Sequence, residues 1–236
     1  MKNKKPKSAQ PNVAYQLFQN RIFTLLSRNR NLRNKFINVV DAFNYLEWVR
    51  DQFGVEKFDD TREIVWSKIS EQVDREFEGI EFGVAWGYLT WWWITNHPTQ
   101  LISWHGFDRF TGLPREWRYL PKGEFDAGGK TPNLKDSRIS WHVGDIEKTI
   151  NHLVLDKNRS YSVLVFFDLD IYEPSLIAWE HIKNSLIMGD ILYFDEAFDL
   201  DERKLIVENV LTFGEFEFIG ASMTSLALKV VSIHKI

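Results

Sequence analysis

Residues 79–87 read GIEFGVAWG, and this stretch decides the fold of the chain. Glu81 ends a short apolar run, Gly83 and Gly87 follow at four-residue spacing, and a helix-compatible segment comes next. This order is typical of the first strand of a parallel α/β sheet and the tight turn after it, where glycine permits a positive φ and close approach of a ligand. Ala85 breaks the G-x-G-x-x-G spacing of dinucleotide binding. A carboxylate before the glycines favours a ligand with a positive amino-acid moiety, and a plain strand-to-helix turn is an equal alternative.

Outward from this stretch the apolar pattern alternates between strands and helices. The expected strands are Ile80–Val84, Leu101–Phe107, Arg138–Val143, Ser162–Asp168, Asp190–Phe194, Phe216–Ile219 and Ser225–Val231. The expected helices between them are Leu89–Asn96, Ile146–Leu155, Ser175–Ser185 and Asp201–Phe213. This alternation predicts an α/β fold, a doubly wound and mostly parallel seven-stranded sheet with ligands at the carboxyl ends of the strands. Only residues 220–224 separate the last two strands, which must therefore form an antiparallel hairpin.

Three segments are expected along the chain. Residues 1–12 form a flexible basic tail, 13–78 a helical accessory segment or lid with a break near residues 53–55, and 79–236 the ligand-binding domain. The loop from Asp108 to Asp136 lacks periodicity and is rich in glycine and proline, which is typical of a functional cover.

Charge and composition limit the classes of partner. The 236 residues carry a net charge of −4 and no cysteine, so disulfides and thiolate chemistry are excluded. The redox compartment stays open on this ground, and a cytoplasmic location is expected. No acidic residue precedes Asp41, whereas nine basic ones do. This segment is either a patch for nucleic acid or anionic membrane, or, as we favour, a solvated tail and helix face. No apolar run approaches the ~20 residues that span a bilayer.

Acidic residues end the expected strands at one rim of the sheet. Asp108 ends the second strand, where a carboxylate can accept hydrogen bonds from a ribose or close an Asx turn. Asp168 ends the strand that begins at Ser162, Asp170 follows it, and Asp195 and Glu196 end the next strand. Converging carboxylates repel one another unless a cation binds or a proton is shared. Oxygen ligands suit Mg²⁺, Mn²⁺ or Ca²⁺, and helix N-caps are an alternative that explains Asp195 better than the whole set.

Four segments together resemble one protein family. Glu81-Phe82-Gly83 with Gly87, residues 105–114 (HGFDRFTGLP), residues 167–172 (FDLDIY) and residues 194–196 (FDE) are similar to the macrocin O-methyltransferase type of class I S-adenosylmethionine-dependent methyltransferases. The segment from Gly106 to Pro114 is the most specific, and residues 122–125 and 128–130 also fit the family. The resemblance covers about residues 79–231 and implies a Rossmann-like methyltransferase fold.

The resemblance also implies roles for individual residues. S-adenosylmethionine would be bound by Glu81, Gly83, Gly87, Thr90, Asp108 and Asp145. A divalent ion, Mg²⁺ first, would be held by Asp168, Asp195 and Glu196. Asp168 or Asp170 would be the catalytic base, and which of them is left open, because some relatives place a histidine where Leu169, Asp170 and Ile171 stand.

The predicted function is metal-assisted O-methylation of a small-molecule hydroxyl, by resemblance a sugar of a natural product or glycan. The alternatives are a non-catalytic S-adenosylmethionine-fold scaffold, a nucleic-acid methyltransferase that uses the basic N-terminus, and a nicotinamide-dependent oxidoreductase. Nucleic acid is disfavoured by the acidic charge, and assembly into a homo-oligomer stays open. Trp104 and Trp117 are expected to reach the pocket, Trp91–Trp93 to lie in the core, and His142 to be structural rather than functional.

Overall fold

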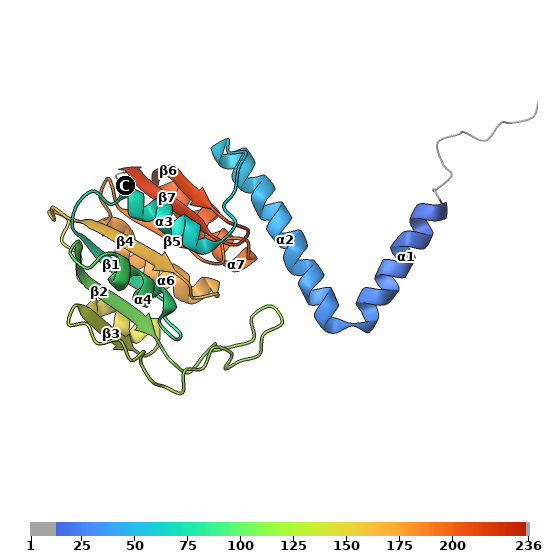
Figure 1. Ribbon diagram of the computed structural model, residues 1–236, viewed down its shortest axis with the longest axis horizontal. Coiled ribbons are helices and arrows are strands. Elements are labelled where there is room, and N and C mark those ends of the chain that lie inside the picture. The colour runs from blue at the N-terminus through green and yellow to red at the C-terminus, as the bar shows by residue number, and fades with distance from the viewer. Residues whose placement is uncertain (1–12, 235–236) are drawn as a thin grey trace, which may run out of the picture. The chain divides into compact units, whose positions relative to one another are not determined.

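A seven-stranded sheet forms the centre of the larger part of the chain (Figure 1). Its strands are β1 (Phe77–Phe82), β2 (Leu101–Asp108), β3 (Ile139–Val143), β4 (Ser162–Phe167), β5 (Ile191–Phe194), β6 (Gly214–Ala221) and β7 (Leu226–Ile233), in the order β3-β2-β1-β4-β5-β7-β6. The first five positions are parallel, and β7 pairs antiparallel with both β5 and β6. The predicted α/β class, a parallel sheet with a closing antiparallel hairpin, is confirmed.

The computed structural model describes residues 13–234, and the chain divides into two units after Asp41. The first unit holds α1 (Val13–Arg28) and the start of α2 (Arg30–Phe53). Between these helices the Asn29 side chain accepts a hydrogen bond from the Leu32 N–H at 3.0 Å, which caps the start of α2. The predicted basic tail, residues 1–12, lies outside the described residues.

The other helices belong to the second unit. They are α3 (Arg62–Gln72), α4 (Tyr88–Asn96), α5 (Ile146–Thr149), α6 (Tyr172–Ile182), α7 (Leu200–Leu205) and α8 (Leu211–Phe213), with short η1 (Ile150–His152), η2 (Lys183–Ser185) and η3 (Ile206–Val210). The η3 segment is one π-helical turn inside the predicted helix 201–213. Among the described residues, no helix is long and apolar enough to cross a membrane.

Two apolar cores lie on opposite faces of the sheet. In β4, Val163, Val165 and Phe167 pack with α5, α6 and α7, while Leu164 and Phe166 pack with α3 and α4. The two-residue period of a strand produces this division, because successive side chains point to opposite faces. Each buried side chain of this size stabilises the fold by about 1.5–3 kcal/mol. A strand that is apolar at every position therefore lies at the centre of the sheet.

The first strand begins three residues earlier than the apolar pattern predicts, at Phe77 instead of Ile80. Glu78 hides this start, because its buried carboxylate pairs with His105 at 3.0 Å. Gly79 adds no apolar signal, since a Cβ there would meet the Trp104 ring at 2.1 Å. Polar and glycine residues thus occupy strand positions for reasons that local periodicity does not show.

Candidate functional site

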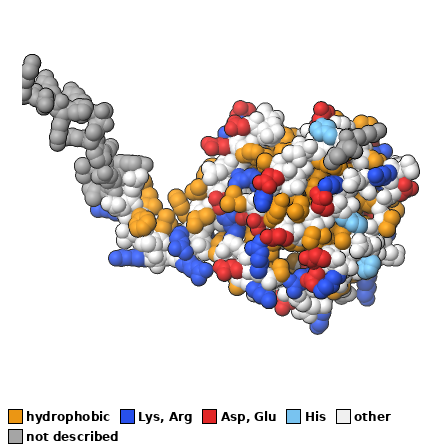
Figure 2. Space-filling view, turned by 180° about the vertical axis from the view of Figure 1, so that it is seen from behind, with side chains coloured by type: hydrophobic (Ala, Val, Ile, Leu, Met, Phe, Trp, Pro, Cys, Tyr) orange, Lys and Arg blue, Asp and Glu red, His pale blue; other side chains and the backbone are white. Residues whose placement is uncertain are grey.

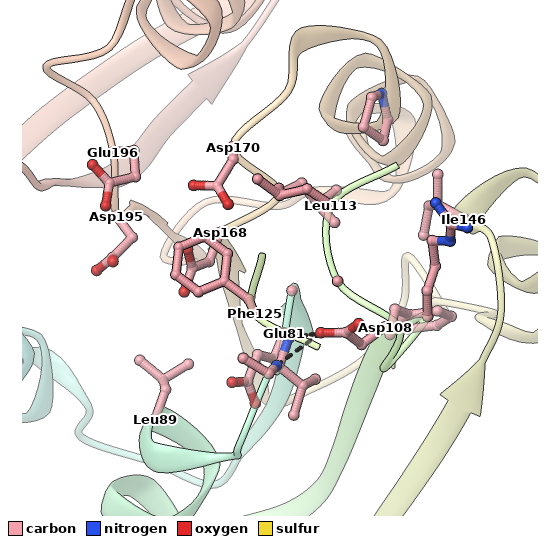
Figure 3. Close-up of a pocket in the computed structure, with 18 of the residues that line it drawn as sticks. Glu81, Leu89, Asp108, Leu113, Phe125, Ile146, Asp168, Asp170, Asp195 and Glu196 are labelled. Carbon is pink, nitrogen blue, oxygen red and sulfur yellow. Dashed lines mark hydrogen bonds between the residues drawn. The ribbon is translucent and has the colours of Figure 1, made fainter. Parts of the chain in front are cut away.

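A cavity of about 340 Å³ lies at the carboxyl ends of the central strands (Figure 3). Strand β1 has β2 on one side and β4 on the other, so the cavity lies where the strand order reverses, the usual ligand position in open α/β sheets. Its wall combines apolar side chains with two arginines and eight carboxylates, namely Glu81, Asp108, Asp145, Glu147, Asp168, Asp170, Asp195 and Glu196. Such a wall favours a cationic ligand over a phosphate-rich one.

Glu81 is the buried carboxylate at the end of β1. Its Oε2 accepts hydrogen bonds from the Thr90 hydroxyl and, at 2.8 Å, from the Trp104 indole N–H. Burial raises the pKa of Glu81 to about 8, and these two hydrogen bonds offset the effect only in part. Thr90 is fully buried and is not among the lining residues, so it fixes the Glu81 side chain from behind the cavity wall.

The turn after β1 depends on its two glycines. Gly83 has φ of +91°, and a Cβ there would lie 1.8 Å from the Asp168 carbonyl oxygen. Gly87 has φ of +78° and precedes the first residue of α4; a Cβ there would meet the Pro132 ring at 2.6 Å. Gly83 lines the cavity, whereas Gly87 packs under residue 132 of the long loop. The first glycine therefore lets β1 and β4 meet at the cavity floor, and the second lets the loop cross the start of α4.

Asp108 holds two loops together. Its Oδ2 accepts hydrogen bonds from the Val84 and Ala85 N–H groups, both at 2.7 Å, and its Oδ1 accepts one from the Phe110 N–H at 2.6 Å. The last of these closes the Asx turn that was the alternative to a ribose contact. Oδ1 can accept one further hydrogen bond, whereas both lone pairs of Oδ2 are engaged. The ribose contact stays a prediction, and the side chain faces the cavity in Figure 3.

Asp145 lies at the rim, before α5. Its carboxylate pairs with Lys148 at 2.7 Å and with Arg109 at 2.9 Å. The hydrogen bond from Lys148, together with the charge of Arg109, lowers the pKa of Asp145. The Arg109 guanidinium at the cavity wall is thus already paired with a carboxylate.

The predicted carboxylates of β4 and β5 come together at one side of the cavity. Strands β4 and β5 are parallel neighbours, with Phe167 opposite Phe194, so Asp168 and Asp195 follow at the same level. Burial raises the pKa of Asp168, and repulsion from the Asp195 and Asp170 carboxylates adds to the effect. Burial also raises the pKa of Asp170 to about 8, and its backbone adopts φ of +61°. Burial and mutual repulsion therefore favour the protonated form of both acids.

Glu196, which lines the cavity, and the buried Glu202, which does not, extend this cluster. Burial raises the pKa values of Glu196 and Glu202, with repulsion from Asp195 and neighbouring acids added to each. Glu202 Oε2 accepts the Glu196 N–H at 2.7 Å, and among the described residues its Oε1 has no hydrogen-bond partner. The α7 helix places Glu202 there, and sequence reasoning did not single it out, since it reads as an ordinary helix residue.

Arg62 is the basic residue that faces this cluster. It begins α3, and its Nη1 donates to Asp195 Oδ2 at 2.7 Å, while the Tyr193 hydroxyl donates to Asp195 Oδ1 at 2.5 Å. Both oxygens of Asp195 are therefore engaged. Sequence reasoning missed Arg62, because it stands in a segment whose apolar pattern indicates only a helix.

The predicted metal ligands have suitable donor atoms but not a suitable arrangement. Carboxylate oxygens suit a hard divalent cation. Within residues 13–234, however, no group of three or more Asp, Glu or His side chains is positioned to hold a metal ion. Arg62 occupies the position beside Asp195 where a cation would bind. As arranged here, Asp168, Asp195 and Glu196 do not fit a metal ion.

The long loop is folded over one side of the cavity. Leu113 and Trp117 form a small buried cluster with Ile171, and Leu113 also lines the cavity. Asp199, next to the start of α7, accepts hydrogen bonds from the Trp117 indole at 3.4 Å and from Arg118. The loop is therefore anchored to the acidic side of the site.

The tryptophans near the site lie partly elsewhere than predicted. Trp104 and Trp117 do not line the cavity: Trp104 is fully buried against Glu81, and Trp117 is buried by its contacts with the loop cluster. Trp86 and Tyr88, which stand on either side of Gly87, line the cavity instead and are 66% and 47% exposed. Of the residues expected in the core, Trp93 is fully buried, but Trp91 is 46% exposed.

His142 is a structural residue among the described ones. Its Nε2 lies 3.1 Å from the His105 Nδ1, and its ring stacks on Phe107 with centroids 4.2 Å apart. Burial, with His105 and His152 nearby, lowers the pKa of His142 to about 4. A neutral ring outside the cavity wall matches the structural assignment.

Comparison with solved structures places the fold. The chain is similar to CalS11, a calicheamicin methyltransferase, with a TM-score of 0.54 and 19% identity over 97% of this chain and 99% of that one. The apo structure of CalS11, a TDP-rhamnose 3′-O-methyltransferase, has a TM-score of 0.49 and 21% identity over 71% of this chain and 76% of that one. The O-methyltransferase NovP has a TM-score of 0.49 and 14% identity over 72% of this chain and 77% of that one. No protein-family model matches, and no curated protein sequence does. The chain has the Rossmann-like fold of S-adenosylmethionine-dependent methyltransferases.

Proposed function

We propose that this chain is an S-adenosylmethionine-dependent O-methyltransferase of the macrocin O-methyltransferase type. The observation that carries the proposal is the acidic cavity at the strand-order reversal, with eight carboxylates and two arginines in its wall. The ligand carries a sulfonium and an ammonium group, so this wall complements its charge. An NAD-type ligand would bring a pyrophosphate against the same carboxylates, at a turn that lacks the glycine spacing for it.

The predicted cofactor residues can be assigned to parts of the ligand. The buried carboxylate of Glu81, held by Thr90, would accept the ammonium group, and Asp108 the ribose hydroxyls. Gly83 leaves room for the ligand at the cavity floor, and Gly87 shapes the same turn from outside the cavity wall. Asp145 lies by the apolar wall of Phe107 and Ile146, where adenine would fit. The residues of this wall thus suit the charged and the flat parts of S-adenosylmethionine.

The chain would have to position an acceptor oxygen and remove its proton. When bound, S-adenosylmethionine supplies an electrophilic methyl group, and alignment of the acceptor with it can contribute about 7–11 kcal/mol. Asp170 or Asp168 would take the hydroxyl proton as the new C–O bond forms and the C–S bond breaks. A base works best with a pKa near the operating pH, and the Asp170 value of about 8 meets this condition.

The acceptor that we propose is a sugar hydroxyl of a small molecule. The exposed rings of Trp86 and Tyr88 at the cavity wall offer flat apolar surfaces on which a sugar ring can stack. Replacement of Trp86 by alanine is expected to raise the acceptor KM about 10-fold, since stacking of this kind contributes about 1 kcal/mol or slightly more. The matched control is Phe23→Ala, which removes an exposed ring of α1 that is not part of the cavity wall. Equal KM values for both variants would contradict this acceptor site.

Binding of Mg²⁺ at Asp168, Asp195 and Glu196 is a separate proposal, and it requires Arg62 to release Asp195. The variant Arg62→Gln is therefore expected to bind Mg²⁺ more tightly than the wild type, because it removes a competing cation. Titration calorimetry of each protein with Mg²⁺ measures this directly. Methyl transfer that continues in excess EDTA, with no Mg²⁺ heat in either protein, would rule out the metal.

Calorimetric titration with S-adenosylhomocysteine tests the proposed function, with NAD⁺ as the competing ligand. We expect heat with the former only, and Asp108→Ala should weaken binding about 10- to 100-fold, as expected when hydrogen bonds to a charged acceptor are lost. Heat with NAD⁺ alone would indicate an oxidoreductase. Binding of S-adenosylhomocysteine with no methyl transfer to any hydroxyl acceptor would favour the scaffold alternative, and salt-dependent binding of RNA or DNA would favour a nucleic-acid methyltransferase.

A further inference from the structure

Exposed aromatic rings continue from the cavity onto the start of α4. Tyr88, the first residue of this helix, lines the cavity, and Trp91 follows three residues later. Their ring centroids are 5.9 Å apart, and the two planes lie within 19° of parallel. Tyr88 is 47% and Trp91 46% exposed, and Trp91 stands outside the cavity wall. We call these two rings the α4 ring pair.

Exposure alone does not mark a site. Apolar side chains are scattered among charged ones over the larger part of the chain, as Figure 2 shows for one face. The α4 ring pair differs in its contacts. The Tyr88 ring also packs on the ring of Trp66, with centroids 5.7 Å apart, and Trp66 is a fully buried residue of the cavity wall. An unbroken series of ring contacts therefore leads from the cavity wall to Trp91.

The start of α4 places both rings on the outward side of the helix. Gly87 has φ of +78° at the N-cap, and its carbonyl accepts the Trp91 N–H at 2.9 Å. Tyr88 and Trp91, three residues apart, share one side of the helix, whereas Leu89 and Trp93 are buried. A surface helix normally carries polar residues on its outward side. Two adjoining rings there indicate a binding surface.

The charges beside the ring pair indicate an uncharged partner. Arg62 and Glu63 begin α3: the Arg62 guanidinium lies 5.6 Å from the Trp66 ring centroid, and the Glu63 carboxylate lies beside the Tyr88 hydroxyl. Arg62 is already paired with Asp195 at 2.7 Å and lies 4.0 Å from Glu63. A phosphate would therefore meet a compensated arginine and a carboxylate. An uncharged ring needs only the flat apolar surface, and sugar hydroxyls could donate to the carboxylate.

We propose that the α4 ring pair is a second acceptor subsite, which binds an uncharged ring linked to the sugar that is methylated in the cavity. This inference rests on the proposed function, and it makes the acceptor a molecule of at least two rings, as in a disaccharide unit or an aryl glycoside. The first ring stacks on Trp86 at the cavity wall. The second ring packs on Trp91 outside it, and Tyr88 joins the two subsites.

A second copy of the chain is a weaker candidate for the same rings. A stable interface buries about 800 Å² on each partner, with an apolar centre. The outward side of α4 continues from Trp91 to Thr95 and Asn96, which are exposed and polar. An apolar surface of two rings followed by polar residues suits one ring of a small molecule better than a protein partner.

Paired glycosides test the subsite on the full chain saturated with S-adenosylhomocysteine. For each of a set of hexoses and deoxyhexoses, the methyl glycoside carries one ring and the nitrophenyl glycoside carries two. Fluorotryptophan labelling gives each tryptophan a fluorine NMR signal, and the signal missing from Trp91→Phe belongs to Trp91. We expect nitrophenyl glycosides of the bound sugars to bind about 10-fold more tightly than methyl glycosides, because of the added stacking. Only the nitrophenyl form should shift the Trp91 signal.

Two variants of Trp91 separate the ring from the rest of the helix. Trp91→Ala should remove the preference, so that both glycosides bind alike. Trp91→Phe keeps a smaller ring and should retain part of the preference. The matched control is Met188→Ala, which removes a 73% exposed apolar side chain before β5, at the opposite end of the strands from the cavity. Circular dichroism checks that each variant keeps its helices.

Three results would overturn the proposal. Equal affinity of the wild type for both glycosides, or no measurable binding of either across the set, would exclude the second subsite. A preference that persists in Trp91→Ala would place the second ring elsewhere. A wild-type oligomer that Trp91→Ala dissociates would assign the ring pair to a second copy. Binding of S-adenosylhomocysteine in the same samples separates each of these results from a failure of the proposed function.

Discussion

At the scale of single residues, Glu81 combines burial with a position at the ligand cavity. Burial raises its pKa from the usual 4.5 to about 8, and Asp108 and Asp195 add to the effect. The unfolded chain therefore loses the Glu81 proton near pH 4.5, whereas the folded chain keeps it until about pH 8. The contribution of this group to stability consequently falls as the pH rises through that window. A bound cation reverses this preference, because it stabilises the charged carboxylate.

Binding of S-adenosylhomocysteine at pH 7 should therefore release up to one proton from Glu81. Calorimetric titrations in phosphate and in Tris measure this proton, since the two buffers have different heats of ionisation. Glu81→Gln is expected to abolish this release and to weaken binding about 10- to 100-fold, the range expected for a charge-assisted hydrogen bond. The control is Glu147→Gln, at an exposed carboxylate in the same cavity wall. The same proton count for the wild type and Glu81→Gln would show that the ammonium group binds elsewhere.

At the scale of elements, the join between β1 and β4 depends on the absence of a side chain at Gly83. The Asp168 carbonyl oxygen occupies the space of a Cβ, and the Gly83 N–H donates to the Phe107 carbonyl at 2.9 Å. One residue thus holds the ends of three strands, β1, β2 and β4, in register at the cavity floor. Any displacement here would move Glu81, Asp108 and Asp168 apart.

Gly83→Ala is expected to destabilise the fold by more than about 3 kcal/mol, because an unfavourable φ alone costs about 1–3 kcal/mol and the clash adds to it. The control is Gly54→Ala, where φ is +67° but nothing lies within 4 Å of the added Cβ. That change should cost about 1–2 kcal/mol, the penalty of the left-handed backbone alone. Urea denaturation of both variants measures the difference. Equal losses would mean that the strands have room to separate, contrary to the close contact described here.

At the scale of the whole molecule, the sequence predicts the architecture better than the contacts within the site. Seven strands and the closing hairpin are predictable because each carries its own apolar run and turn residues. The acids at the strand ends are predictable for the same reason: a parallel sheet brings the ends together wherever the strands are recognised. The start of β1 at Phe77 is not, since Glu78 is buried through a contact with His105, 27 residues further along the chain.

The site residues that the sequence pattern does not predict have one physical feature in common. Arg62 reaches Asp195 across 133 residues of sequence, and its own surroundings indicate only the start of a helix. Trp86 and Tyr88 face the cavity because the turn at Gly83 and Gly87 directs them there, which depends on backbone angles. Trp104 was expected in the pocket, but its indole is fixed by Glu81. Side-chain direction in such cases is set by distant partners, and a local pattern carries no record of them.

The position of β7 between β5 and β6 has a consequence for biosynthesis. Translation makes β7 after every other strand, yet β7 pairs with both of these neighbours in the finished sheet. Until β7 has been made and has emerged, the edge of β5 is therefore unpaired and β6 has no strand to join. Unpaired strand edges favour association between chains. The nascent protein should consequently depend on chaperones, or on rapid completion, until residues 226–233 leave the exit tunnel.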